Sequence, residues 1–327
     1  MTGPRYAVKL SDWSRQELVA RLAGPGLDLW TGPFLNRIRT RIPAVIDGIS
    51  LLYADYPVAA EARAEGGFAD FHVALTQPLG PRRWLRRQVN FEFDGLRIFK
   101  PLPLDQALPM MEWGLNWCIG GHAHQYLIIH SATIEKDGFA AILPGAPGSG
   151  KSTLTAYLVN NGWRLLSDEL ALLSLEDGRV TALARPISLK NQSIDIIGGL
   201  VPSARLSRRS EDTVKGTVAL LKAPTDSLAR IGETAQPAWV IFPTYKKDAA
   251  TALVARPKAD TVIEIGRNAF NYSIHGREGF DLLSKVVDSC ACYDFTYSDL
   301  AEAHAVFAAL EPAALSARAA GSKTSGG

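Results

Sequence analysis

Alternating and helically spaced apolar residues predict a mixture of strands and helices over residues 1–124. Residues 34–42 alternate apolar and basic side chains, which is typical of a strand with one buried face. Residues 44–53 carry apolar side chains at helical spacing, and the apolar run 89–98 is broken at Asp94-Gly95, a typical hairpin turn. The other elements predicted here are a helix from Ser11, as its cap, to Leu22, a strand at 70–75 and a helix at 108–119.

After residue 124, short apolar runs predict strands that are interspersed with helices. The run 139–143 is wholly apolar, which is typical of a buried strand, and an Asp137-Gly138 turn joins it to a strand at 125–134. Residues 152–160 predict a helix that ends at Asn161-Gly162, with the glycine in the left-handed position. The remaining predictions are strands at 163–167, 238–242 and 292–297 and a hairpin of 170–174 with 180–184. Two or three helical segments are predicted from Ala269 onward, around the strand at 292–297, and the last of them lies near 300–310.

We therefore expect an α/β chain with three regions. Residues 1–124 form an N-terminal α+β domain of unknown role, and residues 125–312 form a second α/β domain. Residues 313–327 are a small, polar tail that we expect to be disordered. The polar segment 203–216 is expected to be a basic loop, either solvated or closing over a bound phosphate.

Composition narrows the class of protein. The 327 residues are 47% hydrophobic and 21% charged, as in an ordinary globular protein, and the net charge of +2 predicts neither a nucleic-acid nor a membrane partner. Three cysteines make no disulfide framework, and no signal-peptide core is recognisable, so we expect a cytoplasmic protein. Cys118, His122 and His124 lack a fourth ligand at suitable spacing, so we expect no zinc site there.

The candidate chemistry begins with the motif G-x-x-x-x-G-K-S at 145–152, which is the phosphate-binding loop of nucleotide-binding proteins. Its glycines let backbone N–H groups surround an anion, Lys151 neutralises the β- and γ-phosphates, and the Ser152 hydroxyl can ligate Mg²⁺. A strand before the motif and a helix after it are the context that the motif requires. The residues expected to surround the phosphates are Gly145, Ala146, Pro147, Gly148, Ser149, Gly150, Lys151, Ser152 and Thr153.

An acidic pair follows the next predicted strand. If the strands at 139–143 and 163–167 are parallel, their carboxyl ends lie on one edge of the sheet, which places Asp168 and Glu169 beside the phosphate loop. There they can hold Mg²⁺ or accept a proton. His130 lies on the neighbouring predicted strand and can approach the same site, although such a histidine is more often part of the core.

The order of these motifs resembles that in the catalytic domain of HPr serine kinase/phosphorylase. His130-Ser131, the phosphate loop, Asn161-Gly162 and the sequence LSDE at 166–169 follow one another as in that family. The chain more closely resembles the HPr-kinase-related proteins found beside peptide-modifying gene clusters, which its segments 185–190, 215–217 and 239–243 also resemble. The resemblance covers roughly residues 125–310. It implies, for 125–312, the P-loop kinase fold that HPr kinase shares with phosphoenolpyruvate carboxykinase.

The resemblance also implies roles for individual residues. Asp168 takes the place of the base that removes the acceptor's proton, and Glu169 takes the place of a second Asp that helps to bind Mg²⁺. Glutamate is one methylene longer than the family's residue, which moves the carboxylate outward. His130 matches a histidine near the γ-phosphate. The segment with which true HPr kinases dock HPr and carry out phosphorolysis has no match here.

The function expected from these residues is an ATP- and Mg²⁺-dependent kinase that transfers the γ-phosphoryl group to a hydroxyl. A serine of a peptide or protein is the first candidate acceptor. A small-molecule hydroxyl and a regulatory module that binds ATP without catalysis are the alternatives. Arg185, Lys190 and Lys215 are candidates for balancing charge on the transferred group. The related kinases suggest a homo-oligomer.

Overall fold

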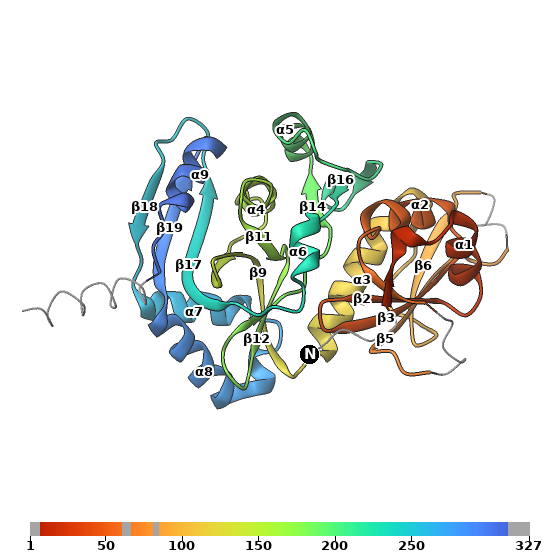
Figure 1. Cartoon of the computed structure of the whole chain (residues 1–327), viewed down its shortest axis with the longest axis horizontal. Coiled ribbons are helices and arrows are strands. Elements are labelled where there is room, and N and C mark those ends of the chain that lie inside the picture. The colour runs from red at the N-terminus through yellow and green to blue at the C-terminus, as the bar shows by residue number, and fades with distance from the viewer. Residues whose placement is uncertain (1–6, 61–66, 81–84, 313–327) are drawn as a thin grey trace, which may run out of the picture. The chain divides into compact units, whose positions relative to one another are not determined.

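The computed structural model describes residues 7–60, 67–80 and 85–312, so the expected tail at 313–327 lies outside the described residues. The chain is mixed α/β, as predicted, and divides into two compact units (Figure 1). The first unit contains the described residues up to His122 together with Ala184–Gly232, and the second contains Ala123–Leu183 and the chain from Glu233 onward. The break at His122 lies close to the expected boundary. Residues 184–232 group with the first unit, whereas we expected them in the second.

The main sheet of the first unit is mostly antiparallel. Its strands run in the order β1-β4-β2-β3-β5-β6-β7, with β8 against β6, and only the β3–β5 pair is parallel among the pairs described. The predicted turn at Asp94-Gly95 joins β6 to β7. The strands are β1 (Ala7–Lys9), β2 (Leu27–Thr31), β3 (Phe34–Thr40), β4 (Pro57–Ala59), β5 (Phe71–Thr76), β6 (Gln88–Phe93), β7 (Leu96–Arg97) and β8 (Leu102–Pro103).

Three helices of the first unit pack around this sheet. The prediction that Ser11 caps the first helix is wrong: α1 begins at Arg15, and Ser14 and Glu17 form a reciprocal capping box. The apolar helix predicted at 108–119 is confirmed, and Met110 and Met111 are buried in the core. The helical elements up to this point are η1 (Leu10–Asp12), α1 (Arg15–Ala23), α2 (Pro43–Leu52), η3 (Leu104–Gln106) and α3 (Ala107–His122).

Residues 184–232 build a small sheet in the order β14-β16-β15. The polar segment at 203–216, predicted to be a loop, contains β15, because Ser210 and Thr213 pair with β16. Several hydrogen bonds tie this part to the rest of its unit: Ser210 donates to the Asp105 carbonyl, and Thr225 donates to Asp55. The elements are β14 (Ile187–Lys190), α5 (Gln192–Leu200), β15 (Ser210–Thr213), β16 (Gly216–Leu221) and α6 (Thr225–Ala229).

The second unit is organised by a sheet in the order β13-β12-β9-β10-β17-β19-β18, with β11 also against β9. β10, β17 and β19 are parallel, so their carboxyl ends meet at one edge, while β9 is antiparallel to β10, β11 and β12. The strands predicted in this half of the chain are all present. They are β9 (Tyr126–Lys136), β10 (Phe139–Pro144), β11 (Arg164–Ser167), β12 (Leu170–Ser174), β13 (Val180–Thr181), β17 (Gln236–Tyr245), β18 (Ala252–Ala255) and β19 (Ala291–Tyr297).

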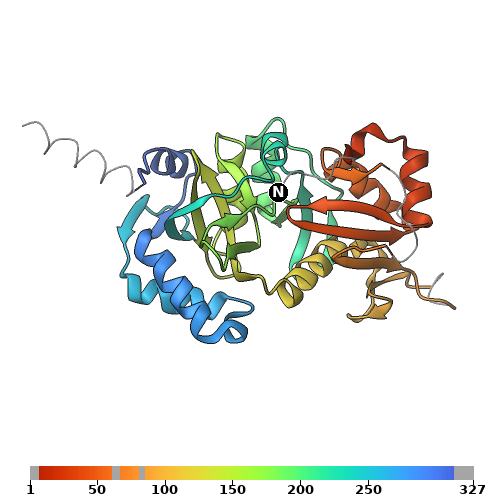
Figure 2. The same cartoon turned by 60° about the horizontal axis from the view of Figure 1, so that its bottom comes forward.

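The helices of the second unit are α4 (Lys151–Val159), α7 (Lys258–Asn268), α8 (Tyr272–Ser289) and α9 (Leu300–Ala308). α9 packs through Phe307, whose ring contacts those of Trp163 and Phe295. α7 and α8 lie together, away from α9 (Figures 1 and 2). Of these helices, sequence reasoning did not identify α7.

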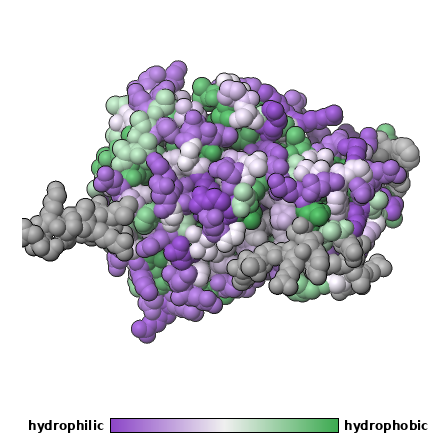
Figure 3. All heavy atoms as spheres, in the orientation of Figure 1, coloured by the Kyte–Doolittle hydropathy of each residue, from purple (hydrophilic) through white to green (hydrophobic). Residues whose placement is uncertain are grey.

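No helix among the described residues is long and apolar enough to cross a membrane. Hydrophilic and hydrophobic residues are interspersed over the face drawn in Figure 3.

Candidate functional site

The predicted phosphate loop lies between β10 and α4, the strand and helix expected on either side of it. Gly148 and Gly150 have φ angles of +85° and +86°, a region that favours glycine, and the helix begins directly afterwards at Lys151. The first N–H groups of α4 therefore face the end of the loop, where a helix favours an anion.

Two strands on one side of the loop hold its backbone. The Tyr245 N–H, at the end of β17, donates to the Ser149 carbonyl at 2.9 Å, and the Tyr297 hydroxyl, at the end of β19, donates to the Gly150 carbonyl at 3.0 Å. A Cβ at Gly150 would overlap the Tyr297 hydroxyl and lie 2.8 Å from Tyr245 Cβ. Burial raises the pKa of Tyr297, so its hydroxyl stays a neutral donor at physiological pH.

Lys151 and Ser152, the two side chains of the motif with predicted roles, both contact groups at the loop. Lys151 is buried, and its Nζ donates to the Gly145 carbonyl at 3.3 Å, so the ammonium group lies across the loop. The Ser152 hydroxyl donates to Asp168 Oδ2 at 3.3 Å, and Asp168 is itself buried. A hydroxyl and a carboxylate thus meet at the head of the loop, as the sequence predicted.

The strand register explains why Asp168 reaches the loop. β9 lies between β10 and β11, which are parallel to each other because each is antiparallel to β9. Ser131 of β9 pairs with Pro144, the last residue of β10, and Thr133 pairs with Ser167, the last residue of β11. Both strands therefore end within two residues of each other along β9, so the segments that follow them come together at that edge.

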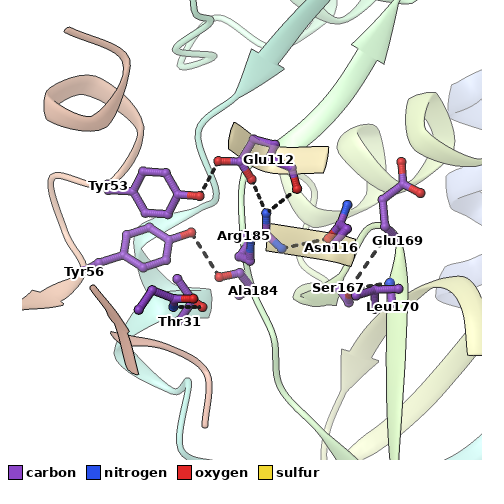
Figure 4. Close-up of polar contacts among 11 residues, drawn as sticks. Thr31, Tyr53, Tyr56, Glu112, Asn116, Ser167, Glu169, Leu170, Ala184 and Arg185 are labelled. Carbon is purple, nitrogen blue, oxygen red and sulfur yellow. Dashed lines mark hydrogen bonds and ion pairs between the residues drawn. The ribbon is translucent and has the colours of Figure 1, made fainter. Parts of the chain in front are cut away.

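The second acidic residue is engaged with the predicted histidine. Glu169 Oε2 lies 3.1 Å from His130 Nε2, and the Glu169 carbonyl accepts a hydrogen bond from the Ser131 N–H. The Ser167 hydroxyl accepts hydrogen bonds from the Glu169 and Leu170 N–H groups, which shapes the corner between β11 and β12 (Figure 4). The longer glutamate thus reaches His130, while the shorter Asp168 faces Ser152.

Sequence reasoning missed three aromatic residues around this site. Phe270, between α7 and α8, lies 5.6 Å from His130 between ring centroids, and its backbone N–H donates to the Ile128 carbonyl. Tyr245 and Tyr297 hold the loop as described above. The signal for the tyrosines was present, because each ends a strand parallel to the one that feeds the loop.

The basic residues proposed as phosphate ligands belong to the first unit. Arg185 is buried there: it donates to Glu112 Oε2 at 2.5 Å, to the Glu112 carbonyl at 3.0 Å and to Asn116 at 2.7 Å (Figure 4). Burial is the largest single influence and lowers the pKa of Arg185, but the interactions with Glu112 and Tyr53 together outweigh burial and raise the pKa. Lys215 Nζ lies 5.2 Å from the centre of the Trp113 ring, and Lys190 ends β14. The charge of Arg185 is therefore compensated within its own unit.

Tyr53 completes the buried cluster around Glu112. Its hydroxyl donates to Glu112, and the neighbouring Tyr56 donates to the Ala184 carbonyl at 3.0 Å (Figure 4). Burial, followed by the Glu112 charge, raises the pKa of both tyrosines well above the ordinary value.

The loop residues fit a bound polyphosphate. Ser149 Oγ is buried within the loop and has no hydrogen-bond partner among the described residues, as expected of a group that awaits an acceptor. For Mg²⁺, the available donors are Ser152 and Asp168. Over residues 7–60, 67–80 and 85–312, no three His, Cys, Asp or Glu side chains converge to hold a metal. Mg²⁺ commonly uses only one or two carboxylates and completes its shell with water and substrate phosphates, so this donor set suits it.

No protein-family model and no curated protein matches this chain.

Proposed function

We propose that the second unit has a P-loop kinase fold of the HPr kinase and phosphoenolpyruvate carboxykinase type, and that the protein is an ATP-dependent kinase acting on a hydroxyl. The observation that carries the proposal is the 3.3 Å contact between Ser152 Oγ and the buried Asp168 carboxylate at the head of the phosphate loop. Phosphoryl transfer depends mainly on positioning and on charge compensation, and these two groups with Lys151 supply both.

Each residue has a role in the proposed reaction. The backbone N–H groups from Gly145 to Thr153 and the ammonium group of Lys151 bind the β- and γ-phosphates. Ser152 and Asp168 would hold Mg²⁺, which neutralises charge on the phosphates when bound. Asp168 also accepts the proton of the acceptor hydroxyl.

Glu169 is assigned a different role from the one that the resemblance implied. Because its carboxylate lies 3.1 Å from His130 Nε2, it would orient the imidazole and would not ligate the metal directly. His130 would then donate a hydrogen bond toward the γ-phosphate.

A serine of a peptide or protein is the first candidate acceptor, and a small-molecule hydroxyl is the second. The alternative from another functional class is a regulatory module that binds ATP without catalysing a reaction. The pairing of Glu169 with His130 favours it, because that pairing leaves only one of the two family carboxylates facing Ser152.

The test is ADP release from Mg-ATP by the wild type and by Asp168→Asn. Each protein is assayed without acceptor, with a peptide fraction of a cell extract and with a metabolite fraction. Release that requires one fraction and is lost in Asp168→Asn supports the kinase and identifies the class of acceptor. ATP binding without acceptor-dependent release supports the regulatory module, and near-normal transfer by Asp168→Asn rejects the proton-acceptor role.

A further inference from the structure

The phosphate loop has two unlike sides. The carboxylates lie on the β9 side, because β11, which ends just before Asp168, pairs with β9. On the opposite side are β17 and then β19, both parallel to β10. In the proposed reaction, the γ-phosphate and the acceptor belong beside Asp168. The nucleoside end must then extend from the loop toward β17.

β17 continues past the level at which β10 ends. Val240 pairs with Ile142, so Phe242 is level with Pro144 and Tyr245 lies three residues further along. At about 3.3 Å per residue, the end of β17 rises roughly 10 Å beside the loop. The Tyr245 N–H there bonds the Ser149 carbonyl at 2.9 Å, so the position of this residue is fixed relative to the phosphates.

The Tyr245 side chain is exposed, as are Ala146, Pro147 and Gly148 in the loop beside it. Its relative exposure is 49%, against 1% for Tyr297, its partner across the β17–β19 pair. Residues paired on neighbouring strands point to the same face, and Tyr297 contacts Gly150 on that face. The rings of Tyr297 and Tyr245 pack in a T-shaped arrangement with 5.7 Å between their centroids, so the buried Tyr297 ring supports one side of the exposed Tyr245 ring.

The span between the two sides suits a nucleoside triphosphate. From β11 across β9 and β10 to β17 there are three strand spacings, about 14 Å in total. That distance is comparable to the length of an extended nucleotide from its terminal phosphate to its base.

We infer that the exposed face of Tyr245 is the platform on which the base of the bound nucleotide stacks. The inference rests on the proposed nucleotide site and says where the nucleoside part of the bound nucleotide lies in that site. An aromatic ring at the edge of a phosphate site offers a flat apolar surface, and a base stacked on such a ring contributes an appreciable part of the affinity.

The experiment compares the binding of Mg-ATP with that of Mg-tripolyphosphate, by calorimetry, to the full chain and three variants. Tyr245→Ala removes the ring, and Tyr245→Phe keeps it. Phe280→Ala is the matched control, since it removes an aromatic side chain of nearly equal exposure, 50%, from α8. We expect Tyr245→Ala to weaken ATP binding roughly 5- to 150-fold and to leave tripolyphosphate binding unchanged. Tyr245→Phe and Phe280→Ala should bind both ligands like the wild type.

Two results would reject the stacking of the base on Tyr245 without rejecting the nucleotide site: unchanged ATP affinity in Tyr245→Ala, or equal losses of affinity for ATP and tripolyphosphate in that variant. The second would mean that the ring only supports the loop backbone. A wild type that binds neither ligand would overturn the nucleotide site itself and the platform with it, so the two failures are distinguishable.

Discussion

The buried ion pair of Arg185 with Glu112 gives the sharpest test of how the basic residues are used. We consider Arg185→Met, which keeps most of the side-chain volume and removes the charge. Both side chains are 6% exposed, and the guanidinium makes two contacts with Glu112 and one with Asn116. Removing one partner of a buried pair leaves the other charge uncompensated, which costs about 3–5 kcal/mol. Such a loss is a large part of a total stability of about 5–15 kcal/mol.

The assay is urea unfolding followed by circular dichroism, with Arg209→Met as the matched control. Arg209 also pairs with a carboxylate of the same unit, Asp195, at 2.5 Å, but the two side chains are 49% and 68% exposed. An exposed pair contributes about 0–1 kcal/mol, so the control should unfold almost like the wild type. The double variant Arg185→Met/Glu112→Leu should recover much of the loss, because it leaves no unpaired charge.

The opposite result has a clear meaning. If Arg185→Met unfolded within about 1 kcal/mol of the wild type but lost phosphoryl transfer, the guanidinium would serve the phosphates, as the sequence suggested. The burial of Arg185 against Glu112 would then not describe its role.

Three further predictions follow from the site and its surroundings. Gly150→Ala and Gly162→Ala both place alanine at a positive φ, +86° and +97°, which costs about 1–2 kcal/mol each. Only Gly150→Ala should also lose tripolyphosphate binding in calorimetry, since a Cβ at Gly162 meets no atom within 4 Å. Equal binding by the two variants would contradict the close packing of the loop. Lys151→Met should reduce acceptor-dependent ADP release by orders of magnitude with an unchanged unfolding curve, and near-normal release would exclude its role at the phosphates. Burial raises the pKa values of Tyr53 and Tyr56 well above the ordinary value, so both tyrosines keep their protons in the folded protein, whereas the unfolded chain loses them near pH 10. The free energy of unfolding should therefore fall above about pH 10, by up to about 1.4 kcal/mol per pH unit for each tyrosine. An unfolding free energy in urea that does not change with pH in this range would refute their burial.

Much of the second unit could be predicted because its signals are local. The Asp137-Gly138 turn, the apolar run of β10 and the glycines of the loop lie within a short stretch, and each requires a particular backbone conformation. The meeting of Ser152 with Asp168 followed from the rule that parallel strands end at one edge. That rule also applied to Tyr245 and Tyr297, whose strands were predicted, but it was not extended to them.

The first unit was harder to predict for two physical reasons. Its decisive contacts join distant segments: Arg185 and Glu112 are 73 residues apart, and nothing in the sequence around Arg185 indicates a buried carboxylate. The segment 203–216 is polar because β15 forms part of a small, half-exposed sheet, and polarity alone suggested a loop. The start of α1 was a local error, since Ser14 and Glu17 have the spacing of a capping box and Ser11 does not need to be the cap.

The discontinuity of the first unit affects how the protein is made. A ribosome synthesises residues 184–232 only after β9 to β13, so Glu112 and Asp55 cannot contact Arg185, Lys222 and Thr225 until that later segment has been made. The first unit therefore cannot complete its core as the nascent chain leaves the exit tunnel, and its final assembly must follow synthesis of Gly232. A gene truncated after codon 124 would encode a polypeptide with a buried carboxylate that never meets its arginine, and proteolysis in the cell is its expected fate.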